Sequence, residues 1–215
     1  MKMNKKVKLQ VAADFLKPEE LIEYVEAVGD KIDIIELGTP YLIMYGATII
    51  KNIKCAAPQV KILCDAKIID AGYYEANELM NMGADYVTVL AVAESTTIKE
   101  CLKAAKEHGK EVVVDMICID DVKNKVKQLE AIGVQAVAVH TGVDQQEAGR
   151  TPLHDLKLIK EVIGETSVFV AGGIDSETLN EYMKHQPDVI IVGGGIFGKN
   201  SYQKETEVLY ELTSH

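Results

Sequence analysis

Basic residues are scarce in this 215-residue sequence, and arginine is nearly absent. There are 23 lysines and arginines against 33 aspartates and glutamates, which gives a formal net charge of −10, and Arg150 is the single arginine. This balance argues against a broad surface for nucleic acid or for an anionic membrane. A bound phosphate could not be held by arginines on several sides, so backbone N–H groups would have to do most of that work.

Closely spaced cysteine pairs and long apolar runs are also missing. No two of the four cysteines have CxxC spacing and no HExxH motif is present, which argues against a zinc site and a disulfide scaffold. No apolar run approaches 18 residues, so we expect no membrane-spanning helix. The apolar run near the N-terminus is too short for a signal peptide. We therefore expect a cytoplasmic protein with reduced thiols at Cys55, Cys64, Cys101 and Cys118.

The sequence contains a regular alternation of two kinds of segment. Short runs rich in Val, Ile and Leu, typical of buried parallel strands, cover residues 8–13, 32–37, 60–64, 86–90, 112–115, 136–139, 167–170 and 189–192. Segments with helical periodicity cover residues 18–28, 73–82, 96–108, 122–132, 152–163, 176–184 and 202–212. About eight strand–helix units predict an α/β protein with a single (β/α)8 TIM barrel over residues 1–215. A doubly wound sheet, the alternative, needs fewer strands for this length.

Several predicted strands end on a titratable side chain. These side chains are Asp14, Glu36, Asp65 with Lys67, Asp115 and His140. A single Asp after a strand more often caps the next helix. In a barrel, however, the carboxyl ends of all strands meet at one mouth, where active sites of this fold lie. The convergence of these residues therefore predicts a functional site there.

The segment from Asp65 to Asp70 is the most specific of these strand ends. Asp65 and Lys67 are two residues apart, so they would point to the same side of an extended chain. A buried lysine needs acidic neighbours, which Asp14, Asp65 and Asp70 can supply. The segment is interpreted as part of a catalytic site, and a salt-bridged barrel rim without catalytic function is the alternative.

Two glycine clusters follow the seventh and eighth predicted strands. They contain Gly172 with Gly173, and Gly193 with Gly194 and Gly195. Barrels that bind phosphate commonly use these two loops, and glycine lets backbone N–H groups approach an anion closely. Tight turns without a ligand are the alternative. Residues 193–198 also match the dinucleotide pattern GxGxxG, but no strand follows them, so we reject a Rossmann fold.

The segment from Asp65 to Asp70 resembles the Asp-x-Lys-x-x-Asp signature of the orotidine monophosphate decarboxylase suprafamily. The resemblance extends over essentially the whole chain. Within that suprafamily, the chain is similar to the 3-hexulose-6-phosphate synthases and their close relatives, the 3-keto-L-gulonate-6-phosphate decarboxylases. The segments that carry this second likeness are residues 9–14, 35–40, 139–144, 170–174 and 191–195.

This resemblance implies a phosphate-binding barrel that joins formaldehyde to D-ribulose 5-phosphate in an aldol reaction. The shared intermediate of synthases and decarboxylases is a 1,2-enediolate stabilised by Mg²⁺. Glu36 and Asp65 match the carboxylates that bind the metal in the family, and a hard cation with oxygen ligands suits such chemistry. The implied partners are therefore small molecules: a sugar phosphate and formaldehyde.

The resemblance also implies roles for other residues. Lys67 matches the lysine that stabilises the enediolate, Asp14 a carboxylate that contacts substrate, and His140 a proposed proton-transfer residue. Asp70 matches an aspartate that reaches the site of a neighbouring subunit, which implies a homodimer with shared active sites. The backbone that binds phosphate in the family matches Gly172, Gly173, Gly193 and Gly194.

Two positions separate the synthases from the decarboxylases. The decarboxylases carry an Arg three residues after the matching His and another Arg in the last phosphate loop. Here these positions are Val143 and Gly194, which favours the synthases. Decarboxylation of 3-keto-L-gulonate 6-phosphate stays the alternative activity, and a barrel that only binds a sugar phosphate is a third, non-enzymatic hypothesis.

Overall fold

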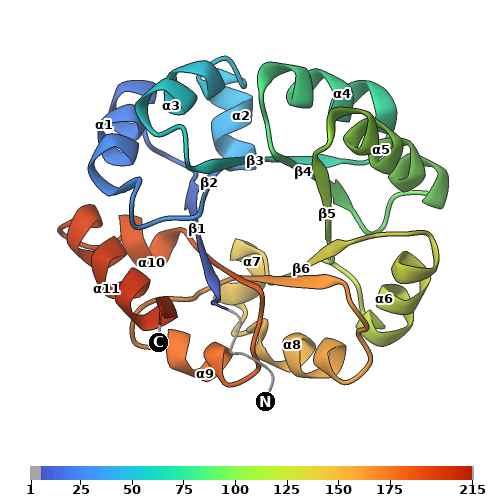
Figure 1. Ribbon diagram of the computed structural model, residues 1–215. Helices are drawn as coiled ribbons and strands as arrows, with labels where there is room; N and C mark the ends of the chain where they lie inside the picture. Colours follow the sequence, from blue (N-terminus) through green and yellow to red (C-terminus); the bar gives the residue numbers. More distant parts are fainter. Residues whose placement is uncertain (1–5, 215) are drawn as a thin grey trace.

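Eight parallel strands follow one another in chain order around a closed barrel (Figure 1). The strands are β1 (Lys8–Ala13), β2 (Ile34–Leu37), β3 (Lys61–Ile68), β4 (Tyr86–Leu90), β5 (Glu111–Asp115), β6 (Ala136–His140), β7 (Ser167–Ala171) and β8 (Val189–Val192). Pairing of β8 with β1 closes the sheet. This computed structural model describes residues 6–214, and it confirms the predicted (β/α)8 barrel.

The helices surround the barrel (Figure 1). They are α1 (Pro18–Val28), α2 (Thr39–Tyr45), α3 (Ile50–Ala56), α4 (Gly72–Met82), α5 (Ser95–His108), α6 (Val122–Ala131), α7 (Val143–Glu147), α8 (Leu153–Lys160), α9 (Leu179–Met183), α10 (Gly194–Phe197) and α11 (Tyr202–Ser214). Across residues 6–214, none of these helices has the length and apolar character that a membrane crossing would require.

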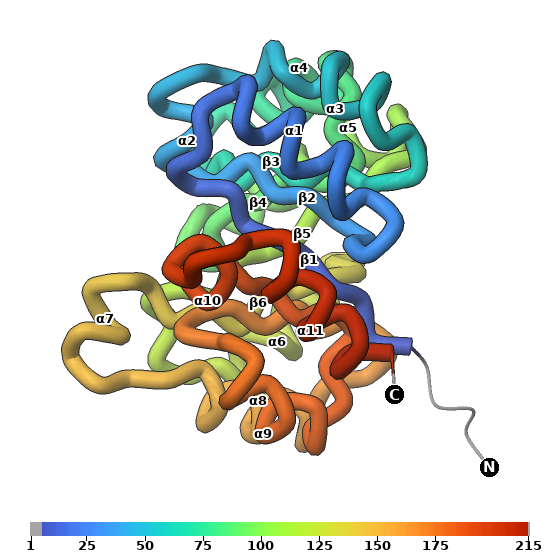
Figure 2. Tube along the Cα trace, turned by 90° about the vertical axis from the view of Figure 1, so that its left-hand side faces the viewer, coloured from blue at the N-terminus to red at the C-terminus, as the bar shows by residue number. Residues whose placement is uncertain are grey.

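Four helices are not predicted by the sequence pattern: α2, α3, α7 and α10. Each has seven residues or fewer, which is too short to show two full periods of the helical pattern. The pair α2 and α3 is separated by Gly46, whose left-handed φ of 68° ends α2. Figure 2 shows α2 and α7 at one end of the barrel and the last turns of α11 at the other.

The third strand is longer than the sequence pattern predicts. The pattern covers residues 60–64, but β3 runs from Lys61 to Ile68 and includes both Asp65 and Lys67. Its pairing with β4 shifts register between Cys64 and Ile68, as at a β-bulge. Polar residues interrupt the hydrophobic pattern after Cys64, so the sequence pattern predicts that the strand ends there. In the structure the strand bends at this point and continues.

Two hydrophobic clusters lie on the two faces of the sheet. The larger combines strand residues such as Val11 and Ile62 with helix residues such as Leu21 and Val25, so it lies between the barrel and its helices. The smaller contains only strand residues, which places it inside the barrel: Ile34, Leu63, Tyr86, Val113, Ala136, Ala138, Phe169 and Val189. Tyr86 and Phe169 meet there edge to face, with ring centroids 6.1 Å apart.

On five of these strands, a residue two positions further along points to the same interior but is polar. Ile34 is followed by Glu36, Leu63 by Asp65, Tyr86 by Thr88, Val113 by Asp115 and Ala138 by His140. The apolar layer thus forms a floor, and a polar layer lies above it at the carboxyl ends of the strands. Because side chains alternate between the two faces of each strand, these polar residues gather inside the barrel at the carboxyl ends of the strands, and we expect the site there.

The opposite end of the barrel carries a compact ion-pair cluster around Asp85, which directly precedes β4. Its carboxylate contacts the ammonium groups of Lys54 at 2.6 Å, Lys61 at 3.2 Å and Lys110 at 2.7 Å, and accepts a hydrogen bond from the Ile62 N–H at 3.0 Å. Burial opposes ionisation, but the hydrogen bonds from Lys110, Lys54 and the Ile62 amide outweigh it and hold the pKa of Asp85 well below its usual range.

We expect Asp85→Ala to lower the free energy of unfolding by about 1–3 kcal/mol, because the buried Ile62 N–H and three partly exposed ammonium groups lose their carboxylate. The folded-state pKa lies below the unfolded value, so this contribution is present above about pH 4 and is lost as the pH falls toward the folded pKa. Urea unfolding at pH 7 and pH 3 measures it. Asp30→Ala, at an exposed Lys31 pair, is the control; equal effects of the two substitutions would contradict the prediction.

Candidate functional site

A cavity of about 960 Å³ opens at the carboxyl ends of the strands. All but one of the predicted site residues line it: Asp14, Glu36, Asp65, Lys67, His140, Gly172, Gly173, Gly193 and Gly194. The exception is Asp70. Asp115, which the sequence identifies as a strand end without assigning it a role, lines the cavity as well.

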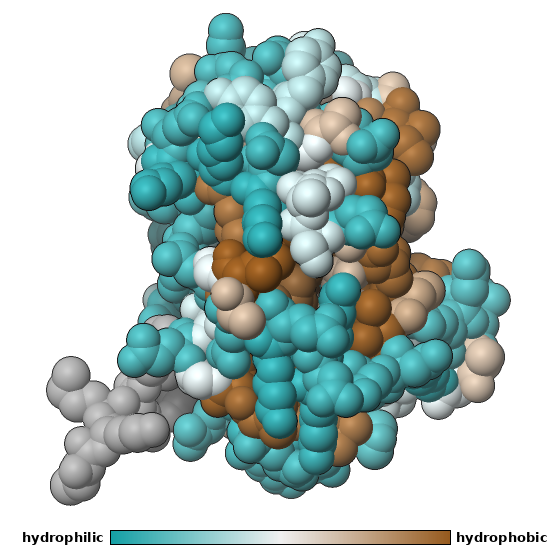
Figure 3. Space-filling model, turned by 90° about the vertical axis from the view of Figure 1, so that its right-hand side faces the viewer, coloured by the Kyte–Doolittle hydropathy of each residue, from teal (hydrophilic) through white to brown (hydrophobic). Residues whose placement is uncertain are grey.

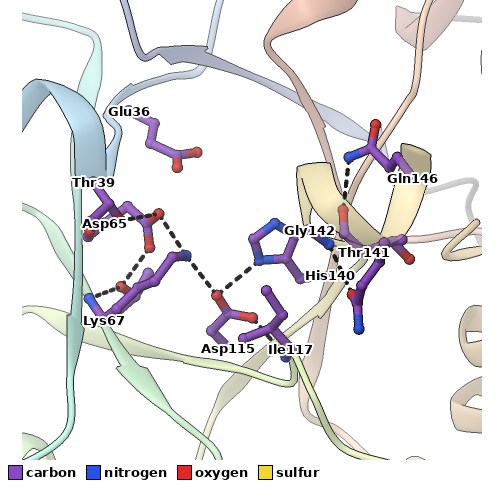
Figure 4. A network of polar contacts seen from close by, with 12 residues as sticks. Glu36, Thr39, Asp65, Lys67, Asp115, Ile117, His140, Thr141, Gly142 and Gln146 are labelled. Atoms are coloured by element: carbon purple, nitrogen blue, oxygen red, sulfur yellow. Dashed lines mark hydrogen bonds and ion pairs between the residues drawn. The ribbon is translucent and has the colours of Figure 1, made fainter. Parts of the chain in front are cut away.

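Lys67 lies at the centre of the polar layer, between two buried carboxylates (Figure 4). Its ammonium nitrogen is 2.8 Å from Asp65 Oδ2 and 2.9 Å from Asp115 Oδ2. Burial disfavours the charged ammonium, but the charges of Asp115 and Asp65 outweigh this and hold the pKa of Lys67 above its usual range. The lysine is therefore a fixed positive charge at the cavity wall.

Asp70 does not pair with Lys67 in this chain, so that part of the sequence prediction is wrong. Its side chain is exposed, and its Oδ1 accepts a hydrogen bond from the N–H of Ala71 at 2.7 Å. The reason is the turn after β3, where Ala71 has a left-handed φ of 50° and α4 begins. The second acidic partner of Lys67 comes from β5, 48 residues further along the chain.

The bulge in β3 brings Asp65 and Lys67 together. The sequence predicts an extended backbone here, but Lys67 has a left-handed φ of 48°. Its N–H donates to Thr88 Oγ1 at 2.9 Å, and the Thr88 hydroxyl donates to Asp65 Oδ1 at 2.8 Å. The Thr39 hydroxyl lies 2.9 Å from Asp65 Oδ2. Bulges often re-aim side chains at active sites, and this one is held by two threonines that sequence reasoning missed.

Asp115 links Lys67 to His140 (Figure 4). Its Oδ2 lies 2.9 Å from His140 Nδ1, and its Oδ1 accepts the N–H of Ile117 at 2.9 Å. Burial opposes ionisation of Asp115, but the hydrogen bond and charge of His140, with Lys67, lower its pKa to about 2. An ionised Asp115 requires Nδ1 to carry a proton, which leaves Nε2 as the nitrogen that can exchange a proton with a bound molecule. The sequence does carry a signal for this role. Asp115 lies two residues after Val113, which points into the barrel, so Asp115 must point into the barrel as well.

Three carboxylates crowd one side of the cavity: Asp14, Glu36 and Asp65. Burial and then the charge of Asp65 raise the pKa of Asp14 to about 6. Burial and then Asp65 likewise hold the pKa of Glu36 well above its usual range. Such mutual repulsion is what a divalent cation relieves, and the oxygen donors suit Mg²⁺.

The carboxylates therefore fit a cation that completes its shell with other oxygens. Within residues 6–214, no three His, Cys, Asp or Glu side chains form a ready-made metal cage. Mg²⁺ commonly binds through one or two carboxylates and keeps water or substrate oxygens as its remaining ligands. Glu36 and Asp65, both 8% exposed, are the residues that could hold it in this way.

The two glycine clusters lie on the loops after β7 and β8, and Gly193 is next to Asp14, because β8 pairs with β1. Gly172 has a φ of 123°, and a Cβ there would lie 2.6 Å from the Thr141 carbonyl oxygen, so only glycine fits. A Cβ on Gly194 would meet no atom within 4 Å. Tight turns are thus present, while the open space at Gly194 leaves room for a ligand against the backbone.

The single arginine lies outside this cavity wall. Arg150 follows α7, is exposed and pairs with Asp155 at 3.2 Å. No arginine is therefore placed to bind an anion in the cavity, as the composition suggested.

We expect Asp14 to make the metal-free protein less stable as pH rises. Its folded pKa of about 6 exceeds the unfolded value of about 4, so stability is fully present below pH 4 and falls as pH rises through 6. Asp14→Asn removes this cost and should raise the free energy of unfolding by about 2 kcal/mol at pH 7.5 but little at pH 4. Chemical unfolding at both pH values measures the difference. The control is Asp144→Asn, an exposed carboxylate at the same cavity; a pH-independent gain would contradict the prediction.

Comparisons with known proteins agree with this geometry. Residues 7–208 match the Orotidine 5'-phosphate decarboxylase / HUMPS family. The chain is 42% identical over 190 residues to 3-hexulose-6-phosphate synthase 2 of Staphylococcus saprophyticus, and the match covers 88% of this chain and 89% of that protein.

Solved structures give the same result. The 3-hexulose-6-phosphate synthase of Salmonella typhimurium superposes with a TM-score of 0.92 and 46% identity, over 97% of this chain and all of that one. The KGPDC of Streptococcus mutans superposes with a TM-score of 0.86 and 26% identity, over 96% of each chain. This chain belongs to the Orotidine 5'-phosphate decarboxylase / HUMPS family.

Proposed function

We propose that the protein is a 3-hexulose-6-phosphate synthase, a lyase that condenses formaldehyde with D-ribulose 5-phosphate through a 1,2-enediolate. The observation that carries the proposal is the Lys67 ammonium, held between Asp65 and Asp115 at the wall of a cavity that also contains a carboxylate cluster and two glycine loops. The names of the relatives at 42% and 46% identity support it.

Glu36 and Asp65 would hold Mg²⁺, which would supply positive charge to the substrate oxygens. Lys67 would stabilise the negative charge that develops on the enediolate, since a preorganised charge in a buried site favours the transition state. Asp14 would contact the substrate at the rim. Its raised pKa makes it a group that can be neutral or charged near physiological pH.

His140 would move the proton. Asp115 fixes its Nδ1, so Nε2 would take a proton from C1 of the sugar phosphate and leave the enediolate. C1 would then form a bond to the formaldehyde carbon, and the formaldehyde oxygen would take up a proton. The phosphate would lie against the backbone of Gly172, Gly173, Gly193 and Gly194.

We further propose that two copies form a homodimer with shared sites. An apolar rim surrounds the loops after β1–β4 and consists of Phe15, Ile43, Met44, Ile69, Tyr74 and Val92, with exposed fractions from 51% to 79%. Figure 3 shows hydrophobic surface along its right-hand edge, at the end of the barrel where these loops lie. Exposed apolar surface at one end of the barrel favours association. Asp70 directly follows Ile69 in this rim, so it would face the partner.

The alternative function is 3-keto-L-gulonate-6-phosphate decarboxylation, which passes through the same enediolate. The likeness to KGPDC at 26% identity keeps it open. Val143, the first residue of α7, lines the cavity as an apolar side chain that is 70% exposed. A charged residue there could order a water molecule that protonates the enediolate, whereas valine cannot. We therefore favour the synthase.

The decisive experiment compares both substrates with one enzyme preparation. We expect kcat/KM for formaldehyde addition to ribulose 5-phosphate to exceed that for the keto-acid phosphate by about tenfold or more, a difference of about 1.4 kcal/mol in transition-state binding. Excess chelator should abolish turnover, and Val143→Arg should shift the ratio toward decarboxylation. A preference for the keto acid would establish the alternative, full activity in chelator would exclude the metal, and no turnover of either substrate would support the binding-protein hypothesis.

A hybrid experiment tests the shared site. Lys67→Ala should lower kcat by about two orders of magnitude through loss of one preorganised charge, and Asp70→Ala should also be inactive. Mixed dimers of the two variants would contain one site with neither substitution, so unfolding and refolding them together should restore activity. Each variant refolded alone is the control. If chain exchange is demonstrated and no activity returns, Asp70 does not complete a partner's site.

A further inference from the structure

Gln10 is a buried polar residue that the chemistry described so far does not use. It lies in β1, is 0% exposed, and contributes to the cavity lining. Its neighbours in register are both hydrophobic: Ile34 on β2 and Ile191 on β8. An amide at this level of the barrel interrupts the apolar floor, so packing alone does not explain its presence.

The hydrogen bonds of Gln10 are incomplete. Its Nε2 donates to Glu36 Oε2 at 2.6 Å, a short contact. Its Oε1 is fully buried and has no hydrogen-bond partner among the described residues. This hydrogen bond keeps the amide nitrogen of Gln10 facing Glu36 and turns its carbonyl oxygen away. A buried acceptor without a donor destabilises a protein unless a bound molecule supplies the donor.

Gln10 is also the one hydrogen-bond partner that the structure provides for the Glu36 side chain in the described region. Asp65, by contrast, is held by the hydroxyls of Thr39 and Thr88 and by the Lys67 ammonium. Three side chains therefore hold the orientation of Asp65. For Glu36, Gln10 provides the single side-chain hydrogen bond among the described residues.

We propose that Gln10 is a positioning residue for a divalent cation at Glu36. Its Nε2 engages Oε2, so Oε1 of Glu36 would be the oxygen available to the cation. This inference rests on the proposed function, in which Glu36 and Asp65 hold the metal. Partners that orient a metal-binding side chain commonly contribute about 10- to 100-fold to metal affinity.

The test measures Mn²⁺ binding to the substrate-free protein by electron paramagnetic resonance, together with thermal unfolding. Gln10→Met keeps the approximate volume of the side chain but removes both hydrogen-bonding groups. We expect it to weaken Mn²⁺ binding by about tenfold or more. The Tm of the metal-free protein should change little, because the substitution removes one unpartnered buried oxygen but also the donor to Glu36. The control is Ile191→Leu, which alters the neighbouring floor position without touching a hydrogen bond.

The outcomes separate this inference from the function on which it rests. If the wild-type protein binds Mn²⁺ and Gln10→Met binds it within about twofold as tightly, the positioning role is overturned and the proposed function stands. If the wild-type protein binds no Mn²⁺, the metal part of the function fails and the inference fails with it. Should Gln10→Met not fold, Gln10→Asn replaces it. Its amide is one methylene too short to reach Glu36, so the same loss of affinity is expected and wild-type affinity would overturn the proposal.

Discussion

The placement of one ammonium group between two carboxylates inside the barrel constrains the rest of the site. Lys67 could not stay charged in the interior without Asp65 and Asp115, since an unpaired buried charge is very costly. Asp65 is in turn fixed by Thr39 and Thr88, and Asp115 by the Ile117 amide and His140. A chain of contacts from β3 through β5 to β6 therefore keeps a positive charge and an imidazole at fixed positions on the cavity wall.

The barrel makes this possible by stacking two interior layers of different chemistry. Ile34, Leu63, Tyr86 and Val113 fill the lower layer, so no water reaches the polar residues from below. The next residues of the same parity are polar, so they share the interior and face the open mouth. Polar groups close to an apolar floor interact strongly, because the local dielectric is low. The same burial raises the pKa of Glu36 and of Asp14.

The pKa values of buried carboxylates are shifted in opposite directions at the two ends of the barrel. At the amino end, Asp85 is surrounded by three lysines and its pKa is lowered, so its charge stabilises the fold. At the carboxyl end, Asp14 and Glu36 lie beside a further carboxylate, and their pKa values are raised, so their charges oppose folding. The like charges are crowded at the end of the barrel where a cation and a substrate would bind. Active sites commonly sacrifice stability in this way.

Much of this protein follows from local sequence patterns. The alternation of Val- and Ile-rich runs with amphipathic segments specifies the (β/α)8 barrel, and the ends of the strands identify Glu36, Asp65, Lys67 and His140, because strands in a barrel share one mouth. The sequence does not show which acids meet. Asp70 is three residues from Lys67 but turns away, whereas Asp115 is 48 residues away and pairs with it. The bulge at Lys67 and the contact of Gln10 with Glu36 depend on pairing between strands. Local patterns reveal the period and polarity of a segment, while the register of its neighbours, set only when the barrel closes, decides which side chains touch.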